Sequence, residues 1–294
     1  MGGGSLAKEY PNEYFLAAFG AACLNYPLWR ASAVGQSGFR VAAVSIGGVG
    51  IPATLTPYVY AFAPPYKGMV GVVLGMTWAR AAIFWGSDRG KEFLQSHGVK
   101  NESISTLLPP LCVSTMVQCI NQPIVRASIT LQNPRFNCPD TVSAIKFIYE
   151  KYGLRGMWHG TSAGILKTVP KYCTAVVIKD YMEEVLPPVD PSSPTVDTDR
   201  LWRSAAKSAT AGVAGAALTN PLDVIRNEMF KKNTPLLETV RNLYKELGRK
   251  FLVRGMGKNM IAVAIPVGST IFFTDTLIQM SKNRQARKAQ QQSA

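Results

Sequence analysis

The chain has 294 residues, of which 47% are hydrophobic and only 17% are charged, and its net charge is +14. An average soluble domain has about 25% charged residues, so this balance disfavours a soluble globular protein. A basic excess beside long apolar stretches indicates a partner of negative charge. Anionic lipid fits better than nucleic acid, because the lysines and arginines form no single stripe and no nucleic-acid-binding motif occurs.

Several apolar stretches of near membrane-spanning length follow one another along the chain. A helix needs roughly 20 predominantly apolar residues to cross a bilayer. Some of the stretches contain Pro, Asn, Lys or Asp, and in lipid such groups must face other helices or a water-filled cavity. We therefore expect an all-α membrane protein whose helices surround a polar centre. The expected spans are residues 13–34, 69–90, 106–131, 161–184, 203–229 and 259–280.

Three short segments, each built around a proline, resemble one another along the chain. Pro27, Pro123 and Pro221 lie 96 and 98 residues apart, and three units of that length nearly fill the sequence. A proline inside a helix removes a hydrogen bond and kinks the axis. Three kinks at one depth are expected to bring three helix ends together below a central cavity. The expected repeats are residues 1–100, 101–195 and 196–294, the last with a basic tail, and together they form one domain.

The motifs around these prolines resemble the mitochondrial carrier family. The family signature runs Pro-x-Asp/Glu-x-x-Lys/Arg with a Gln four places further on, and the third unit matches it best with Pro221, Asp223 and Arg226. The resemblance implies six transmembrane helices in three pseudo-symmetric repeats, with short matrix-side helices, in the mitochondrial inner membrane. It implies a transporter-like protein rather than an enzyme. We expect no metal site and no disulfides, because no CxxC pair occurs and the chain has only two histidines, far apart.

The charges of the family's matrix-side gate are largely missing. In the family, an acid two places and a base five places after each proline form salt bridges between repeats. Only the third repeat keeps both charges, at i and i+3 on one helix, where they can pair with each other. The acidic and basic positions hold Trp29 and Ser32, Val125 and Ser128, and Asp223 and Arg226. The remnants of this gate are Gln36, Gln132, Asp223 and Arg226.

Arg30 and Arg126 occupy the same place in repeats 1 and 2, one residue after the missing acid. One residue turns an α-helix by about 100°, so these side chains do not point where the acids would. Their shared place indicates contacts with lipid, backbone or a partner. Two arginines that snorkel at the surface are an equally good alternative.

The gate at the opposite end is also incomplete. The family has an acid and, three residues later, a base near the end of each even-numbered helix. The first repeat has Asp88 and Lys91, the second has Asp180 but Glu183 in place of the base, and the third has no charge there. Lys91 and Asp180 form the one expected pair between repeats. The remnants of this gate are Asp88, Lys91 and Asp180.

The resemblance also places substrate contacts in the second helix of each repeat. Only Lys167 among them is charged, and a transported anion with two or three charges generally needs more than one cation in a low-dielectric cavity. Lys167 is expected either to hold one carboxylate of a solute or to pair with a carboxylate of the protein. The contact positions are Gly75, Met76, Lys167, Thr168, Val263 and Ala264.

The start of each even-numbered helix resembles a cardiolipin site of the family. There, N–H groups of the helix N-terminus bind phosphate and a basic residue adds charge. We expect structural cardiolipin at two or three of these ends, and no cofactor. The candidate sites are Tyr66-Lys67-Gly68, Trp158-His159-Gly160 and Arg254-Gly255.

Residues 41–63 depart from the family pattern, which has a polar amphipathic helix there. The run is nearly free of charge and contains three glycines and two prolines, so it predicts a poor helix. An apolar stretch of this size usually marks an interface. We expect it to pack against another protein subunit or the membrane surface.

Two functions agree with these features. The missing gate charges, the apolar 41–63 segment and the basic tail favour a degenerate carrier without transport, acting as a structural or accessory subunit of a larger mitochondrial membrane complex, such as a respiratory complex. The alternative is an active carrier that exchanges a small carboxylate, an amino acid or a nucleotide across the inner membrane. A third hypothesis, an outer-membrane relative that shapes membranes or inserts proteins, is weaker. The expected partners are membrane lipids and protein subunits, not nucleic acid.

Overall fold

A computed structural model describes residues 10–39, 45–46, 49–99, 101–136, 138–189 and 196–292. This part of the chain is mostly α-helical, as expected for the fold class. A short antiparallel ladder joins β1 (Ser45–Ile46) to β2 (Val49–Gly50).

Each expected repeat contributes long helical arms with a shorter helix between them. Repeat 1 contains α2 (Pro11–Leu24), α3 (Tyr26–Ser37), α4 (Thr56–Phe62) and α5 (Met69–Ser96). Repeat 2 contains α6 (Glu102–Leu131), α7 (Thr141–Met157) and α8 (Thr161–Val185). Repeat 3 contains α9 (Val196–Lys232), α10 (Leu236–Leu247), the 3-10 helix η1 (Gly248–Val253) and α11 (Met256–Gln292).

The repeated proline acts differently in the first repeat than in the other two. Asn25 leaves helical geometry and its Nδ2 donates to the carbonyl of Ala21 at 2.8 Å, so the arm breaks into α2 and α3. Pro27 then lies in the first turn of α3, where a missing N–H leaves no hydrogen bond unmade. Pro123 and Pro221 lie inside α6 and α9, which continue through them.

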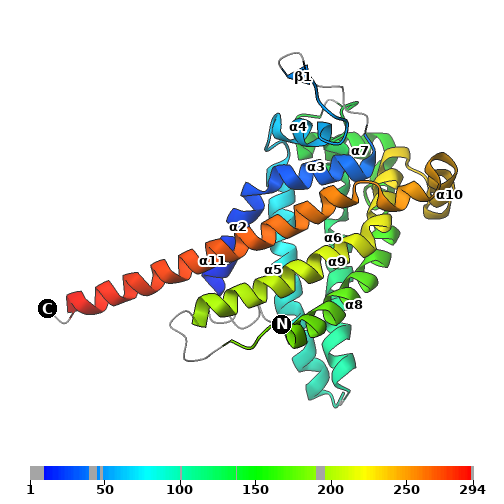
Figure 1. Ribbon diagram of the computed structural model, residues 1–294. Coiled ribbons are helices and arrows are strands. Elements are labelled where there is room, and N and C mark those ends of the chain that lie inside the picture. The colour runs from blue at the N-terminus through cyan, green and yellow to red at the C-terminus, as the bar shows by residue number, and fades with distance from the viewer. Residues whose placement is uncertain are drawn as a thin grey trace.

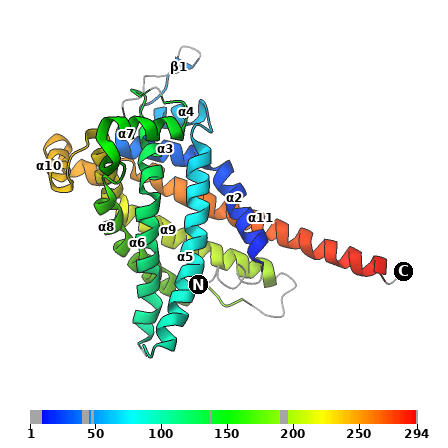
Figure 2. The ribbon, with the colours of Figure 1, turned by 180° about the vertical axis from the view of Figure 1, so that it is seen from behind.

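The contacts between the long helices form a closed ring, and Figures 1 and 2 show the bundle from two opposite sides. Contacts run from α2 to α5, α5 to α6, α6 to α8, α8 to α9, α9 to α11 and back from α11 to α2. At one end α3 and α6 both contact α9, and α4, α7 and α10 lie at that same end (Figure 1). We call it the converging end. The convergence of three proline-bearing arms agrees with what the repeated proline predicts.

Three glycines repeat the same packing between repeats at the converging end. Gly68, Gly160 and Gly255 have φ of 76°, 84° and 70°, a left-handed conformation that favours glycine. A Cβ atom at these positions would come within 2.2, 2.5 and 2.6 Å of a neighbouring atom. Each neighbour lies in the first arm of the next repeat, so the pattern closes from repeat 3 onto repeat 1. The neighbours are Leu131, Phe230 and Gln36 respectively.

The apolar segment before α5 forms more structure than its sequence predicts. Residues 56–62 form α4, so the expectation of a poor helix is wrong for this part, where Pro57 lies in the first turn. Ala61 of α4 is fully buried against α3, whereas Leu55 and Phe62 are about half exposed. Residues 41–44 and 47–48 lie outside the described part of the chain. Docking of this segment to a subunit or membrane surface stays a prediction.

Two described segments are long and apolar enough to cross a membrane by length and composition. They are Ile104–Leu131 and Leu236–Ile278, and Met69–Ala79 is a shorter apolar helix. The expected count of six transmembrane helices therefore stays a prediction.

Candidate functional site: a central cavity with one charged wall

A cavity of about 540 Å³ lies inside the ring and is lined by α2, α3, α5, α6, α8, α9 and α11. Sites for small organic molecules commonly have a volume of this order. Because every arm of the ring contributes, any movement of one repeat against another changes the shape of this cavity.

Four of the expected substrate-contact positions meet in this cavity, namely Gly75, Met76, Lys167 and Val263. Ala264 and Thr168 do not line it, and the Thr168 hydroxyl donates instead to the carbonyl of Gly164 at 3.2 Å. Both expected positions of repeat 1 and one of the two in repeats 2 and 3 thus line the cavity, and their contact with a substrate stays a prediction.

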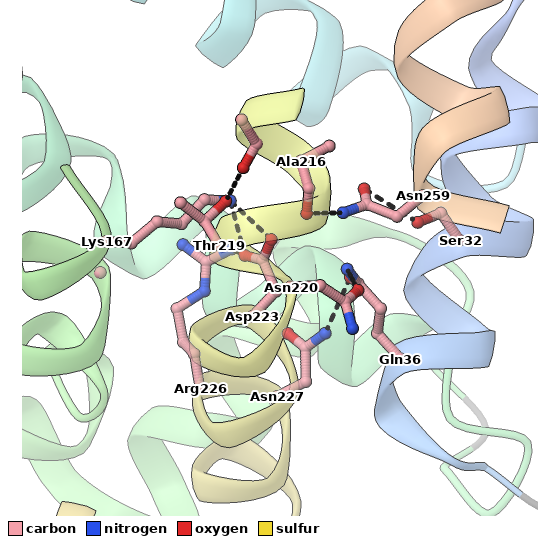
Figure 3. A network of polar contacts seen from close by, with 12 residues as sticks. Ser32, Gln36, Lys167, Ala216, Thr219, Asn220, Asp223, Arg226, Asn227 and Asn259 are labelled. Atoms are coloured by element: carbon pink, nitrogen blue, oxygen red, sulfur yellow. Dashed lines mark hydrogen bonds and ion pairs between the residues drawn. The ribbon is translucent and has the colours of Figure 1, made fainter. Parts of the chain in front are cut away.

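Lys167 pairs with a carboxylate of the protein (Figure 3). Its Nζ lies 2.7 and 2.6 Å from the two carboxylate oxygens of Asp223, which comes from the next repeat. Arg226 also contacts Asp223, at 3.1 Å, so the expected i,i+3 pair forms. Of the two alternatives for Lys167, the structure has the pair within the protein. The sequence did not predict Asp223 as this partner, because partners of Asp223 are expected only at the basic gate positions, and Lys167 is a substrate-contact position.

Among the described residues that line the cavity, the charged ones stand on α8 and α9. They are Lys167, Lys171, Asp223 and Arg226, which together carry two more positive than negative charges when ionised. The remaining walls are apolar or carry neutral amides and hydroxyls. Their apolar members include Val72, Val73, Met76, Ile124, Val263 and Val267, and their amides include Asn25, Asn121 and Asn259. One wall is thus charged and the rest are not.

The converging end is closed by apolar contact where the family uses ions. Ala33, Ile129 and Phe230, from three different repeats, form a buried cluster. Trp29 and Val125 pack against it. These two residues occupy the acidic positions of repeats 1 and 2, so the lost charges are replaced by an apolar plug rather than left as a gap.

A neutral polar network joins repeat 1 to repeat 3 beside the plug (Figure 3). Nε2 of Gln36 donates to Asn220 Oδ1 at 3.1 Å, and Asn227 donates to Gln36 Oε1 at 3.5 Å. The Ser32 hydroxyl donates to Asn259 Oδ1 at 3.3 Å. The side chain of Gln36, an expected remnant of the gate, therefore forms hydrogen bonds with two side-chain amides.

At the opposite end, an unexpected acid joins repeats 2 and 3. Glu183, where the resemblance requires a base, pairs with Arg203 at 2.8 Å and also with Lys207. The side chain of Asp180 lies outside the described part of the structure, so its pairing with Lys91 stays a prediction, as does any gate role of Asp88. The sequence signal that could have predicted the Glu183 contacts is the pair of basic residues, Arg203 and Lys207, near the start of α9.

The candidate lipid sites differ in charge. Tyr66 and Trp158 are 49% and 43% exposed, as an interface would allow. Burial, and next the charge of Arg126, hold the pKa of His159 below its usual range, although its contact with the Thr234 carbonyl partly opposes this. The His159 ring is therefore neutral at pH 7 and adds no charge. Arg254 pairs with Glu228 at 3.0 Å. Lipid binding at these ends stays a prediction.

Comparison with known proteins supplies the family. The family described as mitochondrial carrier protein matches residues 101–189 and 197–285, more than half of the chain. Mitochondrial ornithine transporter 1 of Saccharomyces cerevisiae is 22% identical over 225 residues, which cover 71% of this chain and 74% of the transporter. The human mitochondrial carnitine/acylcarnitine carrier protein is 23% identical over 70% of this chain and 71% of its own length. The human mitochondrial coenzyme A transporter is 24% identical over 63% and 59% respectively. These relatives are transporters and not enzymes, and the chain belongs to the mitochondrial carrier family.

Proposed function

We propose that this protein is an active solute carrier of the mitochondrial inner membrane, and that it binds a small organic anion in the central cavity. The observation that carries the proposal is the charged wall on α8 and α9, which has an excess of two positive charges. Ionisable groups inside membrane helices usually mark a solute path. The relatives support transport, because each is named as a transporter or carrier.

The solute anion is expected to compete with Asp223 for its cations. Asp223 is 5% exposed and accepts from both Lys167 and Arg226. Lys171 lines the same wall. A carboxylate or phosphate that enters can take a place beside Lys167 while Arg226 keeps Asp223 paired. Such an exchange of partners leaves no charge buried alone, which is the costly outcome.

The uncharged walls limit what the rest of the solute can be. Val72 and Val73 of α5 and Ile124 of α6 offer no partner for a second charged group. Asn121 donates to the carbonyl of Gly75 and accepts from Trp78, so it is already engaged. We therefore expect a solute whose anionic groups lie together at one side and whose remaining body is neutral.

The interpretation as an accessory subunit without transport is not supported by the comparisons. It rested on the missing gate charges, the apolar 41–63 segment and the basic tail. For the gate positions, the apolar plug offers a different means of closure. The relatives favour the carrier alternative. An outer-membrane location has no support either.

Counter-exchange in proteoliposomes tests the proposal. Full-length protein is reconstituted into liposomes that are loaded with one solute from a panel of carboxylates, amino acids, phosphate and nucleotides. Uptake of the same solute in labelled form is then followed. Saturable uptake of at least one anion is expected, lost in Lys167→Ala and kept in Lys146→Ala, because Lys146 is a surface lysine of α7, 77% exposed. Folded protein that takes up no member of the panel, or uptake that survives Lys167→Ala, would contradict it.

A further inference from the structure

We infer that Arg30 and Arg126 are positioning residues that hold the converging end closed in place of the lost ion pairs. The inference deepens the proposed function, since closure of one end matters only to a protein that alternates between closed and open forms. It rests on one arrangement that occurs twice, in repeats 1 and 2.

The two arginines are equivalent in sequence and in burial. Each lies three residues after the repeated proline, and each is 0% exposed. Surface snorkelling is therefore wrong for both. The equivalent residue of repeat 3 is Val224, also fully buried. The arrangement belongs to the two repeats that lack gate charges and is absent from the repeat that keeps them.

Arg30 joins three elements. Its Nε donates to Gln132 Oε1 at 2.7 Å, a residue of repeat 2 just beyond α6. Its Nη1 donates to the carbonyls of Ala61, at 2.9 Å, and Pro64. The guanidinium also lies 5.7 Å from the ring centre of Tyr60. Arg30 thus ties α3 to its own matrix-side helix α4 and to the next repeat.

Arg126 repeats this pattern one repeat later. Its Nη2 donates to Asn233 Oδ1 at 2.8 Å, just beyond α9 of repeat 3. Its guanidinium lies 4.9 Å from the ring centre of Tyr152 in α7 and 6.0 Å from that of Phe230 in α9. The arm, its own short helix and the next repeat are again joined by one side chain.

The acceptors are amides, carbonyls and aromatic rings rather than acids. Within the described part of the chain, neither arginine has a carboxylate at ion-pair distance. Nε and Nη1 of Arg126 have no hydrogen-bond partner there. A buried cation without a counter-ion depends strongly on each remaining contact. Separating the repeats would remove the strongest of these contacts.

Both arginines lie behind the plug as seen from the cavity. Trp29 and Val125 line the cavity, whereas Arg30 and Arg126 do not. The plug therefore excludes the solute, and the arginines fix the arms that carry the plug. Opening this end requires breaking an arginine-to-amide hydrogen bond at two of the three junctions between repeats.

The test uses access to the cavity rather than transport, so its outcome does not depend on the solute. Ser128 lines the cavity beside the plug. A full-length variant with Ser128→Cys and the natural cysteines replaced by serine is placed in proteoliposomes. A membrane-impermeant methanethiosulfonate is then applied from the side that the converging end faces. The labelling rate is compared among the parent, Arg30→Gln, Gln132→Glu and the double variant, with thermal unfolding measured in parallel.

We expect Arg30→Gln to raise the labelling rate several-fold. Gln132→Glu should lower the rate and raise the unfolding temperature, because it gives Arg30 a true counter-ion. In the double variant the same glutamate has no arginine partner, so labelling should be at least as fast as in Arg30→Gln. Should Arg30→Gln fail to fold, the slowed labelling of Gln132→Glu still decides the question. Unfolding temperatures that shift while labelling rates stay equal would show a purely structural role and overturn the inference.

Discussion

In repeat 3, Asp223 and Arg226 keep the charged positions that follow the repeated proline, and both face the cavity. In repeats 1 and 2 the same positions hold no charge, and a buried arginine stands one residue after the acidic position. A shift of one residue turns a side chain by about 100° around its helix. The arginines of repeats 1 and 2 therefore lie in the junctions between repeats and not on the cavity wall.

The difference assigns two roles, binding of the solute and closure of the converging end, to charged residues in different repeats. Repeat 3, together with Lys167, provides charge where a solute can reach it. Repeats 1 and 2 use charge for closure, out of the solute's reach. Loss of charge at the usual positions is therefore weak evidence for loss of transport, because other residues nearby can close the same end.

Removing the cation that faces Asp223 should have the largest effect. Lys167→Ala leaves a carboxylate that is 5% exposed with Arg226 as its remaining partner. Breaking a buried pair costs about 3–5 kcal/mol when the remaining charge is left alone, so this figure is the upper bound of the expected loss. Thermal unfolding in detergent should show a clear loss of stability. The double variant Lys167→Ala/Asp223→Ala should recover most of it. If the single variant is as stable as the wild type, the pair is not important to the folded state.

Returning an acid to repeat 1 should be the next largest change. Trp29→Asp puts a carboxylate against the apolar plug, and burying an unpaired polar group costs about 1–3 kcal/mol or more. Adding Ser128→Lys restores the family's charge pair between repeats 1 and 2 and should recover part of the stability. Unfolding temperatures of the two variants measure this. Equal stability of Trp29→Asp and wild type would mean that the plug does not exclude charge.

A smaller effect is expected at a glycine junction. Gly160→Ala adds a Cβ 2.5 Å from Phe230 at φ 84°, and strain together with overpacking is worth roughly 1–3 kcal/mol. Gly98 has φ 85° and open space around it, so Gly98→Ala reports the backbone strain alone. Unfolding temperatures should fall further for Gly160→Ala than for Gly98→Ala. Equal losses would assign the whole effect to the backbone.

The smallest expected effect is a pH dependence that arises at His159. Because burial lowers its folded pKa, the unfolded chain binds the proton more readily. The stability contribution is complete above the ordinary histidine pKa of about 6.5 and is lost as the pH falls through the lower folded value. Wild-type protein should lose more stability than His159→Gln between neutral and mildly acidic pH. Parallel curves for the two proteins would exclude this site as the cause.

The sequence predicted the helical class from composition, and the family resemblance predicted that Lys167 faces the cavity. It did not predict the contacts of Lys167, Arg30 or Glu183, because their partners lie in another repeat and depend on which arms meet. Spacing fixes the face of a helix on which a residue lies, but not the neighbour of that face. The usable signals were the shared place of Arg30 and Arg126 in two repeats and, for Glu183, the basic residues Arg203 and Lys207 near the start of α9.

The claim that the charged wall of repeats 2 and 3 binds an anion is tested most directly by ligand-induced stabilisation. Anything that binds only the folded state raises its unfolding temperature. Purified wild type and Lys167→Ala are unfolded with organic anions and with organic cations of similar size. At least one anion should raise the unfolding temperature of wild type and fail to do so for Lys167→Ala. Stabilisation by cations alone, or by the same anions in both proteins, would contradict the account.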